Sequence, residues 1–272
     1  MSSNDEQHTA QRDGEQEKTQ AQVKSLEIRV LRQDSLEHPR TRRWETYAVS
    51  LPPTSTLAEA LRAAQCAPLT TDGSTVAPLA FDHDCQQGLC GACSVLVDGR
   101  VTLACTAKLG DLSPRGRRIE VAPLSKFPLI RDLVVDRGAM EAGLQAMATP
   151  LDADVREAPH PHPTQEQQQV LAALSRCIGC AACLEACPEY GPHSEFLGPV
   201  VLAEAERGEH VPHAALGREV RLAVATGPGG IDDCGNAHNC AEVCPVGVPL
   251  TEALGRLSRL ATRRWFAHLL GG

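Results

Sequence analysis

Seven cysteines in the C-terminal half of this 272-residue chain fall into two runs, and their spacing constrains the fold more than any other feature. The first run has the pattern C-x2-C-x2-C-x3-C-P and consists of Cys177, Cys180, Cys183, Cys187 and Pro188. Cysteine thiolates at this spacing bind iron–sulfur clusters, and the fourth thiolate of such a run binds a second cluster rather than the first. The pattern therefore requires a partner run elsewhere in the chain.

The partner run consists of Cys234, Cys240, Cys244 and Pro245. Aligned by spacing, it repeats the first run, except that Ala237 stands where the second cysteine is expected. Because alanine cannot bind iron, we predict one [4Fe-4S] cluster and one [3Fe-4S] cluster in this half of the chain. With the fourth cysteines exchanged between the runs, the predicted [4Fe-4S] ligands are Cys177, Cys180, Cys183 and Cys244. The predicted [3Fe-4S] ligands are Cys187, Cys234 and Cys240.

A structural zinc site is the alternative interpretation of these runs, because zinc also binds paired C-x2-C motifs. Zinc does not require two interlocked runs that both end in Cys-Pro, so the spacing favours clusters. The chain has 12 cysteines, and its N-terminus lacks the apolar segment of a secretory signal. Cysteines in this context are typical of metal ligands in a reducing compartment rather than of disulfides.

Four cysteines in the N-terminal half have the spacing C-x4-C-x2-C, with a fourth after eleven further residues, which is the plant-type [2Fe-2S] pattern. Gly88 and Gly91 flank the second cysteine, and glycine suits a loop that turns sharply and brings N–H groups near the sulfides. Unrelated core thiols are the alternative, which four cysteines at this spacing disfavour. The predicted [2Fe-2S] ligands are Cys85, Cys90, Cys93 and Cys105. The remaining cysteine, Cys66, lies on an apolar helical segment and is predicted to be a buried small hydrophobe.

Hydrophobic patterning divides the chain into a tail and two domains. Residues 1–22 are rich in Gln, Glu, Asp and Ser, so we predict a disordered tail. Residues 23–130 contain several short apolar segments with the pattern of β-strands and one segment, 57–64, with the pattern of a helix. This combination predicts a β-grasp sheet. In residues 131–272 the apolar spacing is helical. The predicted fold class is therefore α+β, with an N-terminal β-grasp [2Fe-2S] ferredoxin-like domain followed by an all-α two-cluster ferredoxin-like domain.

Turn and cap residues support this division. Asp98-Gly99 between two apolar runs predicts a type I′ hairpin, and Ser55 or Thr56 is the expected N-cap of the first helix. Thr164 with Gln167 predicts a capping box at the start of a later helix. Residues 122–135 are predicted to cross between the domains, and further helices are predicted at 196–206, 218–225 and 251–270.

Charge and hydropathy exclude some classes of partner and location. The formal net charge of −8 argues against nucleic acid as the main partner. No apolar run reaches the roughly 18 residues that a membrane-spanning helix needs. The last predicted helix, 251–270, is amphipathic. We interpret it first as a core helix, with a membrane-surface contact through Arg263, Arg264, Trp265 and Phe266 as the alternative.

With these motifs in place, the chain resembles the iron–sulfur subunit of succinate dehydrogenase or fumarate reductase, respiratory complex II. The resemblance covers nearly everything from Val23 onward, and it rests on both Cys-Pro runs and on three further stretches, 84–93, 103–106 and 127–136. It implies an electron-transfer subunit of a succinate dehydrogenase (quinone), an enzyme of the tricarboxylic acid cycle. Electrons would pass between the FAD of a flavoprotein subunit and quinone at a membrane-anchor cytochrome b subunit, through the [2Fe-2S], [4Fe-4S] and [3Fe-4S] clusters.

The same resemblance implies where the chain works and what it does not do. It predicts a peripheral membrane protein on the cytoplasmic face of a bacterial inner membrane. Substrate chemistry would belong to the flavoprotein, and we predict no catalytic acid, base or nucleophile in this chain. The sequence does not distinguish succinate oxidation from fumarate reduction.

The chain departs from well-known ubiquinone-reducing members at two positions. Pro192 stands where those members have Trp, and Gly235 stands where they have His. Because both side chains help to bind ubiquinone there, we predict menaquinone as the partner instead. The predicted quinone-side residues are Pro188, Gly235, Asn236 and His238, with an ordinary surface histidine as the alternative reading of His238.

Two other functions are alternatives to a complex II subunit. One is the iron–sulfur subunit of a glycolate-oxidase or heterodisulfide-reductase-like complex, which lacks this combination of a plant-type pattern and a three-thiolate run. The other is a free-standing multi-cluster electron carrier. Co-purification with a flavoprotein distinguishes the free carrier from the complex subunit.

Overall fold

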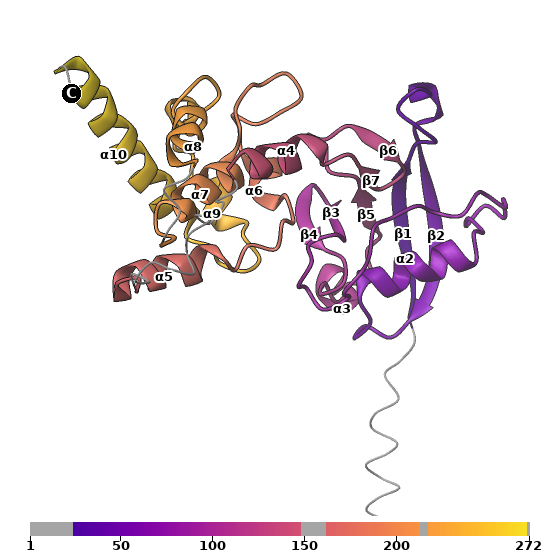
Figure 1. Cartoon of the computed structure of the whole chain (residues 1–272). Coiled ribbons are helices and arrows are strands. Elements are labelled where there is room, and N and C mark those ends of the chain that lie inside the picture. The colour runs from indigo at the N-terminus through magenta and orange to yellow at the C-terminus, as the bar shows by residue number, and fades with distance from the viewer. Residues whose placement is uncertain (1–23, 148–161, 213–216, 271–272) are drawn as a thin grey trace, which may run out of the picture.

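The N-terminal domain is built on a five-stranded mixed sheet with the order β2-β1-β5-β3-β4. The structure is a computed structural model that describes residues 24–147, 162–212 and 217–270, so the predicted tail at 1–22 lies outside the described residues. β1 pairs antiparallel with β2 and parallel with β5, and β5 joins this pair to the β3–β4 hairpin (Figure 1). The strands are β1 Lys24–Arg32, β2 Arg43–Leu51, β3 Ser94–Val97, β4 Arg100–Leu103 and β5 Ile119–Ala122.

Helix α2 (Leu57–Cys66) packs on this sheet and begins as the sequence predicted. Thr56 is its N-cap and forms a capping box with Glu59. Leu57 and Leu61 are fully buried, as expected for an apolar helical stripe against a sheet. The prediction for Cys66 was wrong, because this cysteine is exposed. Cys66 is the last residue of the helix and falls off the buried stripe, so it does not face the sheet.

The β3–β4 hairpin turns at Asp98-Gly99, as predicted. Both residues have positive φ, 48° for Asp98 and 79° for Gly99, which is the backbone conformation of a type I′ turn. This turn fixes the register, so that Ser94 pairs with Leu103 at the opposite end of the hairpin. That end is where the cysteines of the first domain lie.

A second, two-stranded hairpin connects the domains. It consists of β6 (Leu129–Arg131) and β7 (Val134–Val135) and lies in the segment predicted as a simple crossing. Leu133 packs in the core of the sheet domain, whereas Val135 packs in the core of the helical domain. The hairpin therefore contributes to both cores.

A buried charge network attaches this hairpin to the sheet. Arg32 and Asp132 are fully buried, and the guanidinium of Arg32 donates to both carboxylate oxygens of Asp132 at 3.0 and 2.9 Å. Arg32 also donates to Glu45 at 2.8 Å, and Asp132 accepts the N–H of Ala80 at 3.0 Å. The network thus connects β1, β2 and the hairpin to the segment that leads to Cys85.

Replacing Asp132 by alanine is expected to destabilise the sheet domain by about 3 kcal/mol, because it leaves a buried guanidinium short of a partner. The measurement is the urea concentration at which the visible absorption of the [2Fe-2S] cluster is lost. Asp34→Ala is the control, since the side chain of Asp34 forms an exposed ion pair with Arg43 at 3.0 Å, worth at most about 1 kcal/mol. Equal urea midpoints for the two variants contradict a structural role for the network.

The C-terminal domain is helical, and α7 lies at its centre. α7 packs against α4, α5, α8 and α10, and Val201, Leu202 and Ala205 on it are buried. Gly198 has a φ of 90° and Pro199 is the first helical residue, so α7 begins later than the predicted residue 196. The helices are α4 Gly138–Ala146, α5 Gln165–Leu174, α6 Ala182–Ala186, α7 Pro199–Gly208, α8 Arg218–Ala225, α9 Asn239–Glu242 and α10 Leu250–Leu269.

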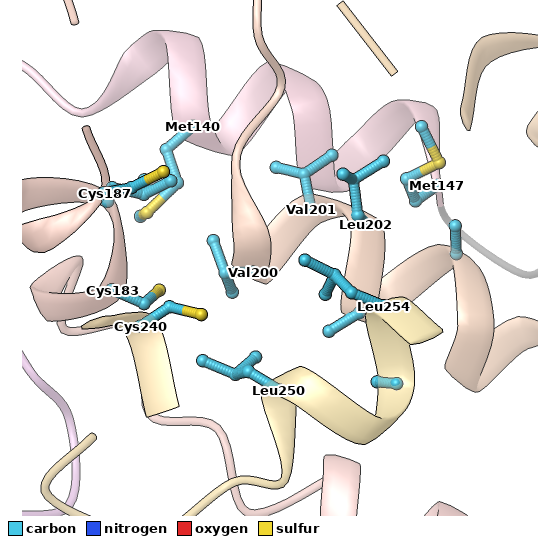
Figure 2. Close-up of a cluster of buried hydrophobic side chains, with 14 of the residues drawn as sticks. Met140, Met147, Cys183, Cys187, Val200, Val201, Leu202, Cys240, Leu250 and Leu254 are labelled. Atoms are coloured by element: carbon cyan, nitrogen blue, oxygen red, sulfur yellow. The ribbon is translucent and has the colours of Figure 1, made fainter. Parts of the chain in front are cut away.

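Several features of these helices agree with the sequence analysis. Thr164 and Gln167 form the predicted capping box at α5. Helix α10 extends away from the domain at its C-terminal end (Figure 1), where Trp265 and Phe266 are exposed. The core around α7 includes three cysteines at one edge, Cys183, Cys187 and Cys240 (Figure 2). The sites of these cysteines are therefore continuous with the hydrophobic core.

Candidate iron–sulfur sites

The four cysteines of the first domain are brought together by the β3–β4 hairpin. Cys93 directly precedes β3, and Cys105 follows the end of β4 by two residues. The pairing of Ser94 with Leu103 places these two cysteines at the same end of the hairpin, and the N–H of Ala104 donates to the carbonyl of Cys93 at 3.1 Å. The other two cysteines lie on the loop that enters β3.

Backbone N–H groups of this loop point at the sulfur atoms. Gln87 and Leu89 donate to Sγ of Cys85 at 3.4 and 3.3 Å, and Gly88 donates to Sγ of Cys105 at 3.3 Å. The N–H groups of Gln87 and Leu89 lower the pKa of Cys85 to about 7, with Gln87 as the larger contribution. Gly88 has a φ of 72°, the left-handed conformation that glycine favours. The loop is therefore shaped to stabilise negative charge on sulfur, as its glycines predicted.

The first run of the helical domain lines a cavity together with the last cysteine of the second run. This cavity is bounded by four thiols and by apolar residues, among them Val200 and Leu250. The N–H of Val248 donates to Sγ of Cys244 at 3.3 Å. The four cysteines are the predicted [4Fe-4S] set, Cys177, Cys180, Cys183 and Cys244.

The other three cysteines line a second cavity. Ala237 lies in its wall, at the position where the repeat would place a thiol. Residues 235–239 are exposed, so this cavity borders the surface. All four predicted quinone-side residues line it as well, Pro188, Gly235, Asn236 and His238. Pro192 lies elsewhere and lines a groove between the domains.

The two runs have the same backbone conformation at equivalent positions. Gly179 and Asn236 have φ values of 63° and 54°, and Ala181 and His238 have values of 62° and 63°. Each of the latter two is the N-cap of a short helix, α6 or α9, that carries the cysteine at the third position of the repeat, Cys183 or Cys240. The repeat in cysteine spacing is thus also a repeat of backbone conformation. His238 is the N-cap residue of α9, a role that could not be seen in the sequence.

The electrostatic fields of the thiols group Cys177 with Cys244, and Cys240 with Cys187 and Cys234. Burial raises the pKa of Cys177, and the field of Cys244 raises it further. Burial also raises the pKa of Cys240, with further contributions from Cys187 and Cys234. Cys244 is therefore close to the first run, although it follows the second in sequence.

Cys183 lies between the two sets. It is buried, and its pKa is raised well above its usual value by that burial and by Cys180, Cys177, Cys240 and Cys244. Figure 2 shows Cys183 and Cys240 side by side, below Cys187. The two cavities are therefore neighbours.

Within the described ranges, no three His, Cys, Asp or Glu side chains come close enough to hold a single metal ion. The four thiolates of an iron–sulfur cube each bind a different iron atom, so they surround a larger space than the ligands of one ion. The chemistry of the donors, all thiols with N–H groups beside several of them, fits iron–sulfur clusters in all three places.

Glu185 and Lys126 also contact this region, and the sequence analysis missed both. The carboxylate of Glu185, on α6, is buried and accepts the N–H groups of Ser125 and Lys126 at 2.9 and 3.1 Å. The ammonium of Lys126 donates to the carbonyl of Cys187. These contacts join the crossing segment to the helix that carries Cys183, but the partners are too distant in sequence to form a local motif.

A sheet domain with four thiols at one end, followed by a helical domain with two neighbouring cavities lined by thiols, defines a two-domain electron-transfer protein of the ferredoxin type. Residues 27–142 match the family described as the 2Fe-2S iron-sulfur cluster binding domain, and residues 173–248 match the 4Fe-4S dicluster domain. The particular family follows from relatives of known name.

The chain is 30% identical over 253 residues to the succinate dehydrogenase iron-sulfur subunit of Bacillus subtilis, an alignment that covers 92% of this chain and 98% of the relative. It is 33% identical over 193 residues to the fumarate reductase iron-sulfur subunit of Haemophilus influenzae, and this alignment covers 65% of this chain and 73% of the relative. The chain therefore belongs to the family of iron–sulfur subunits of succinate dehydrogenase and fumarate reductase. In these oxidoreductase complexes it is an electron-transfer subunit, so the predicted family and function are confirmed.

A solved structure agrees on the fold. A chain of the Mycobacterium smegmatis Sdh1 complex in the apo form superposes with a TM-score of 0.76 at 22% identity, covering 90% of this chain and 98% of that one. The predicted α+β class, with two ferredoxin-like domains in this order, is confirmed. In the described part of the chain, no helix has both the length and the apolarity needed to cross a membrane.

Proposed function

We propose that this chain transfers electrons between the FAD of a flavoprotein subunit and a membrane quinone through three clusters. Cys85, Cys90, Cys93 and Cys105 would hold a [2Fe-2S] cluster. The two cavities of the helical domain would hold a [4Fe-4S] cluster and a [3Fe-4S] cluster on the exchanged cysteine sets given above. When bound, such clusters supply one-electron redox chemistry, and the residues around them tune the potential.

The observation that carries this proposal is the placement of the three thiol sets next to one another. A Cβ atom added to Gly91, in the first loop, would lie 2.7 Å from both Cα and N of Cys180, so these two loops are in contact. Cys183 and Cys240 are neighbours in turn. The three sites therefore form a continuous series that begins at one domain and ends at the exposed loop 235–239.

The two ends of the series differ in what they expose. At the first end, the cysteine loop carries Leu89, which is 65% exposed, and in the proposed complex this end would face the flavoprotein. At the other end, the loop 235–239 would face quinone and the membrane-anchor cytochrome b subunit. The chain would then be peripheral, on the cytoplasmic face of the membrane.

Co-purification tests this proposal. The chain, tagged and isolated from membranes of its own cells in mild detergent, is expected to bring with it an FAD-containing protein and a membrane subunit. The isolated complex is expected to reduce added quinone with succinate or to oxidise quinol with fumarate. Isolation of the chain alone, with full iron content, contradicts the proposal and supports a free-standing carrier.

The quinone itself is proposed to be menaquinone. Gly235 replaces the histidine of ubiquinone-reducing members, and a Cβ atom here would collide with the carboxylate of Glu189. The wall of the cavity at this point is therefore backbone and carboxylate rather than imidazole. When a buried quinone carbonyl lacks its hydrogen-bond donor, the binding free energy is weakened by about 1–3 kcal/mol, which lowers the affinity roughly tenfold to a hundredfold.

Gly235→His is expected to improve turnover with a short-chain ubiquinone relative to menaquinone by about tenfold, because it restores an N–H donor once Glu189 turns away. The measurement is kcat/KM of the complex with both quinones. Gly191→His is the matched control, since an added Cβ at Gly191 meets no atom within 4 Å and this residue lies outside the cavity wall. Wild-type turnover that is equal or better with ubiquinone rules out the menaquinone assignment.

A further inference from the structure

We propose that Arg137 is a positioning residue for electron transfer between the [2Fe-2S] and [4Fe-4S] clusters. Its guanidinium joins the cysteine loop of the sheet domain to the first cysteine run of the helical domain. The inference rests on the proposed ligand sets and adds a residue that is neither a ligand nor part of a cysteine motif.

Three hydrogen bonds define the position of this side chain. Nη1 of Arg137 donates to the carbonyl of Gly91 at 3.2 Å and to the carbonyl of Gly179 at 3.3 Å. Nη2 donates to the carbonyl of Ala92 at 3.2 Å. Gly91 and Ala92 lie between two proposed [2Fe-2S] ligands, and Gly179 lies between two proposed [4Fe-4S] ligands. One side chain therefore binds both ligand loops.

The loops that it joins are in close contact. Gly91 has a φ of 69°, and a Cβ atom there would lie 2.5 Å from the carbonyl oxygen of Ile178 and 2.7 Å from N of Cys180. Only glycine permits this approach. Contact of this kind needs a fixed relation between the domains, and the planar fork of an arginine can bind two or three carbonyl groups at once.

The start of α4 holds Arg137 in place. Arg137 is the residue before this helix, and the carboxylate of Asp136 accepts the N–H of Gly138 at 2.8 Å. The β6–β7 hairpin, which contributes to both cores, ends just before at Val135. The side chain thus extends from the end of a segment that is packed against both domains.

The charge of Arg137 has a second effect. Its partners among the described residues are carbonyl groups rather than carboxylates, so its positive charge is not cancelled by an ion pair. A cation between two clusters favours the reduced, more negative form of each and raises both reduction potentials. When bound, the clusters would exchange a single electron, so that the [2Fe-2S] cluster would be oxidised as the [4Fe-4S] cluster is reduced. The reverse holds in the opposite direction, and no bond forms or breaks.

Two variants separate the bridging role from the charge. In the purified complex, Arg137→Gln removes the charge and most of the fork, whereas Arg137→Lys keeps the charge and loses the fork. Redox titration followed by EPR gives the midpoint potential of each cluster and the spin–spin interaction between the two reduced clusters. Arg131→Gln is the control, since Arg131 lies in the adjoining hairpin and donates to the carbonyl of Pro78 at 3.2 Å, outside both cysteine runs.

We expect Arg137→Gln to shift both midpoint potentials to more negative values and to weaken the spin–spin interaction. Arg137→Lys is expected to keep the potentials near those of the wild type while still weakening the interaction. If the Arg137→Gln variant fails to load iron, the Arg137→Lys variant provides the test. An unchanged spin–spin interaction in the Arg137→Lys variant overturns the inference. The inference is also overturned if an Arg137→Gln variant with full iron content keeps the wild-type midpoint potentials and the wild-type spin–spin interaction. A wild-type complex without the two EPR signals would instead refute the proposed function itself.

Discussion

Replacing Cys244 by alanine is expected to eliminate the [4Fe-4S] cluster and to leave the [3Fe-4S] cluster in place. Cys244 lines the same cavity as Cys177, Cys180 and Cys183, and its field acts on all three of these thiols. Cys240, only four residues earlier, lines the other cavity. The loss of one of four thiolates removes the completing ligand of the cube.

EPR of the complex in the oxidised and dithionite-reduced states measures both clusters of this variant. The signal of the reduced [4Fe-4S] cluster should disappear, while the signal of the oxidised [3Fe-4S] cluster remains. Cys66→Ala is the matched control, because Cys66 is exposed on α2 and belongs to none of the three sets. Selective loss of the [3Fe-4S] signal in the Cys244 variant would refute the exchange of fourth cysteines.

Replacing Ala237 by cysteine is expected to convert the [3Fe-4S] cluster to a [4Fe-4S] cluster. Ala237 lies in the wall of the cavity formed with Cys187, Cys234 and Cys240. It corresponds to Cys180 in the repeat, and Asn236, which precedes it, has nearly the same φ as Gly179. A thiol at this position is therefore presented by the same backbone that presents Cys180.

The oxidised Ala237→Cys protein is expected to lose the [3Fe-4S] EPR signal and to gain a fourth iron per cavity. The midpoint potential should become more negative, because an added thiolate increases the negative charge of the cluster. Ala237→Ser is the control of nearly equal size without a thiol. A full three-iron signal that survives in the cysteine variant, at wild-type iron content, contradicts the assignment of Ala237.

The cysteine sites could be predicted from the sequence because their information is local. Ligands two or three residues apart must share one loop, and the missing cysteine at Ala237 is visible in the spacing itself. The same holds for the N-cap of α2 and the capping box of α5, where Thr56 and Thr164 act within their own first turns. Local chemistry of this kind does not depend on how the rest of the chain packs.

The contacts between distant segments could not be predicted in this way. Asp132 meets Arg32 across 100 residues, and Glu185 meets Ser125 across 60. A lone acidic residue in a sequence gives no sign of such a partner. The failed prediction for Cys66 has a related cause, since the helical stripe identified the buried face correctly but not where the helix leaves the sheet.

The proposed exchange of cysteines between the two cavities would also fix the order in which the sites can be completed during synthesis. A chain leaves the ribosome from its N-terminus, so the thiols of the sheet domain emerge first, at Cys105. The three-thiolate cavity is complete only with Cys240, and the four-thiolate cavity only with Cys244, the last cysteine of the chain. A nascent chain that already carries Cys177, Cys180 and Cys183 therefore still lacks a ligand for that cube. With the proposed ligand sets, the four-thiolate site would be complete only after nearly the whole helical domain has been made.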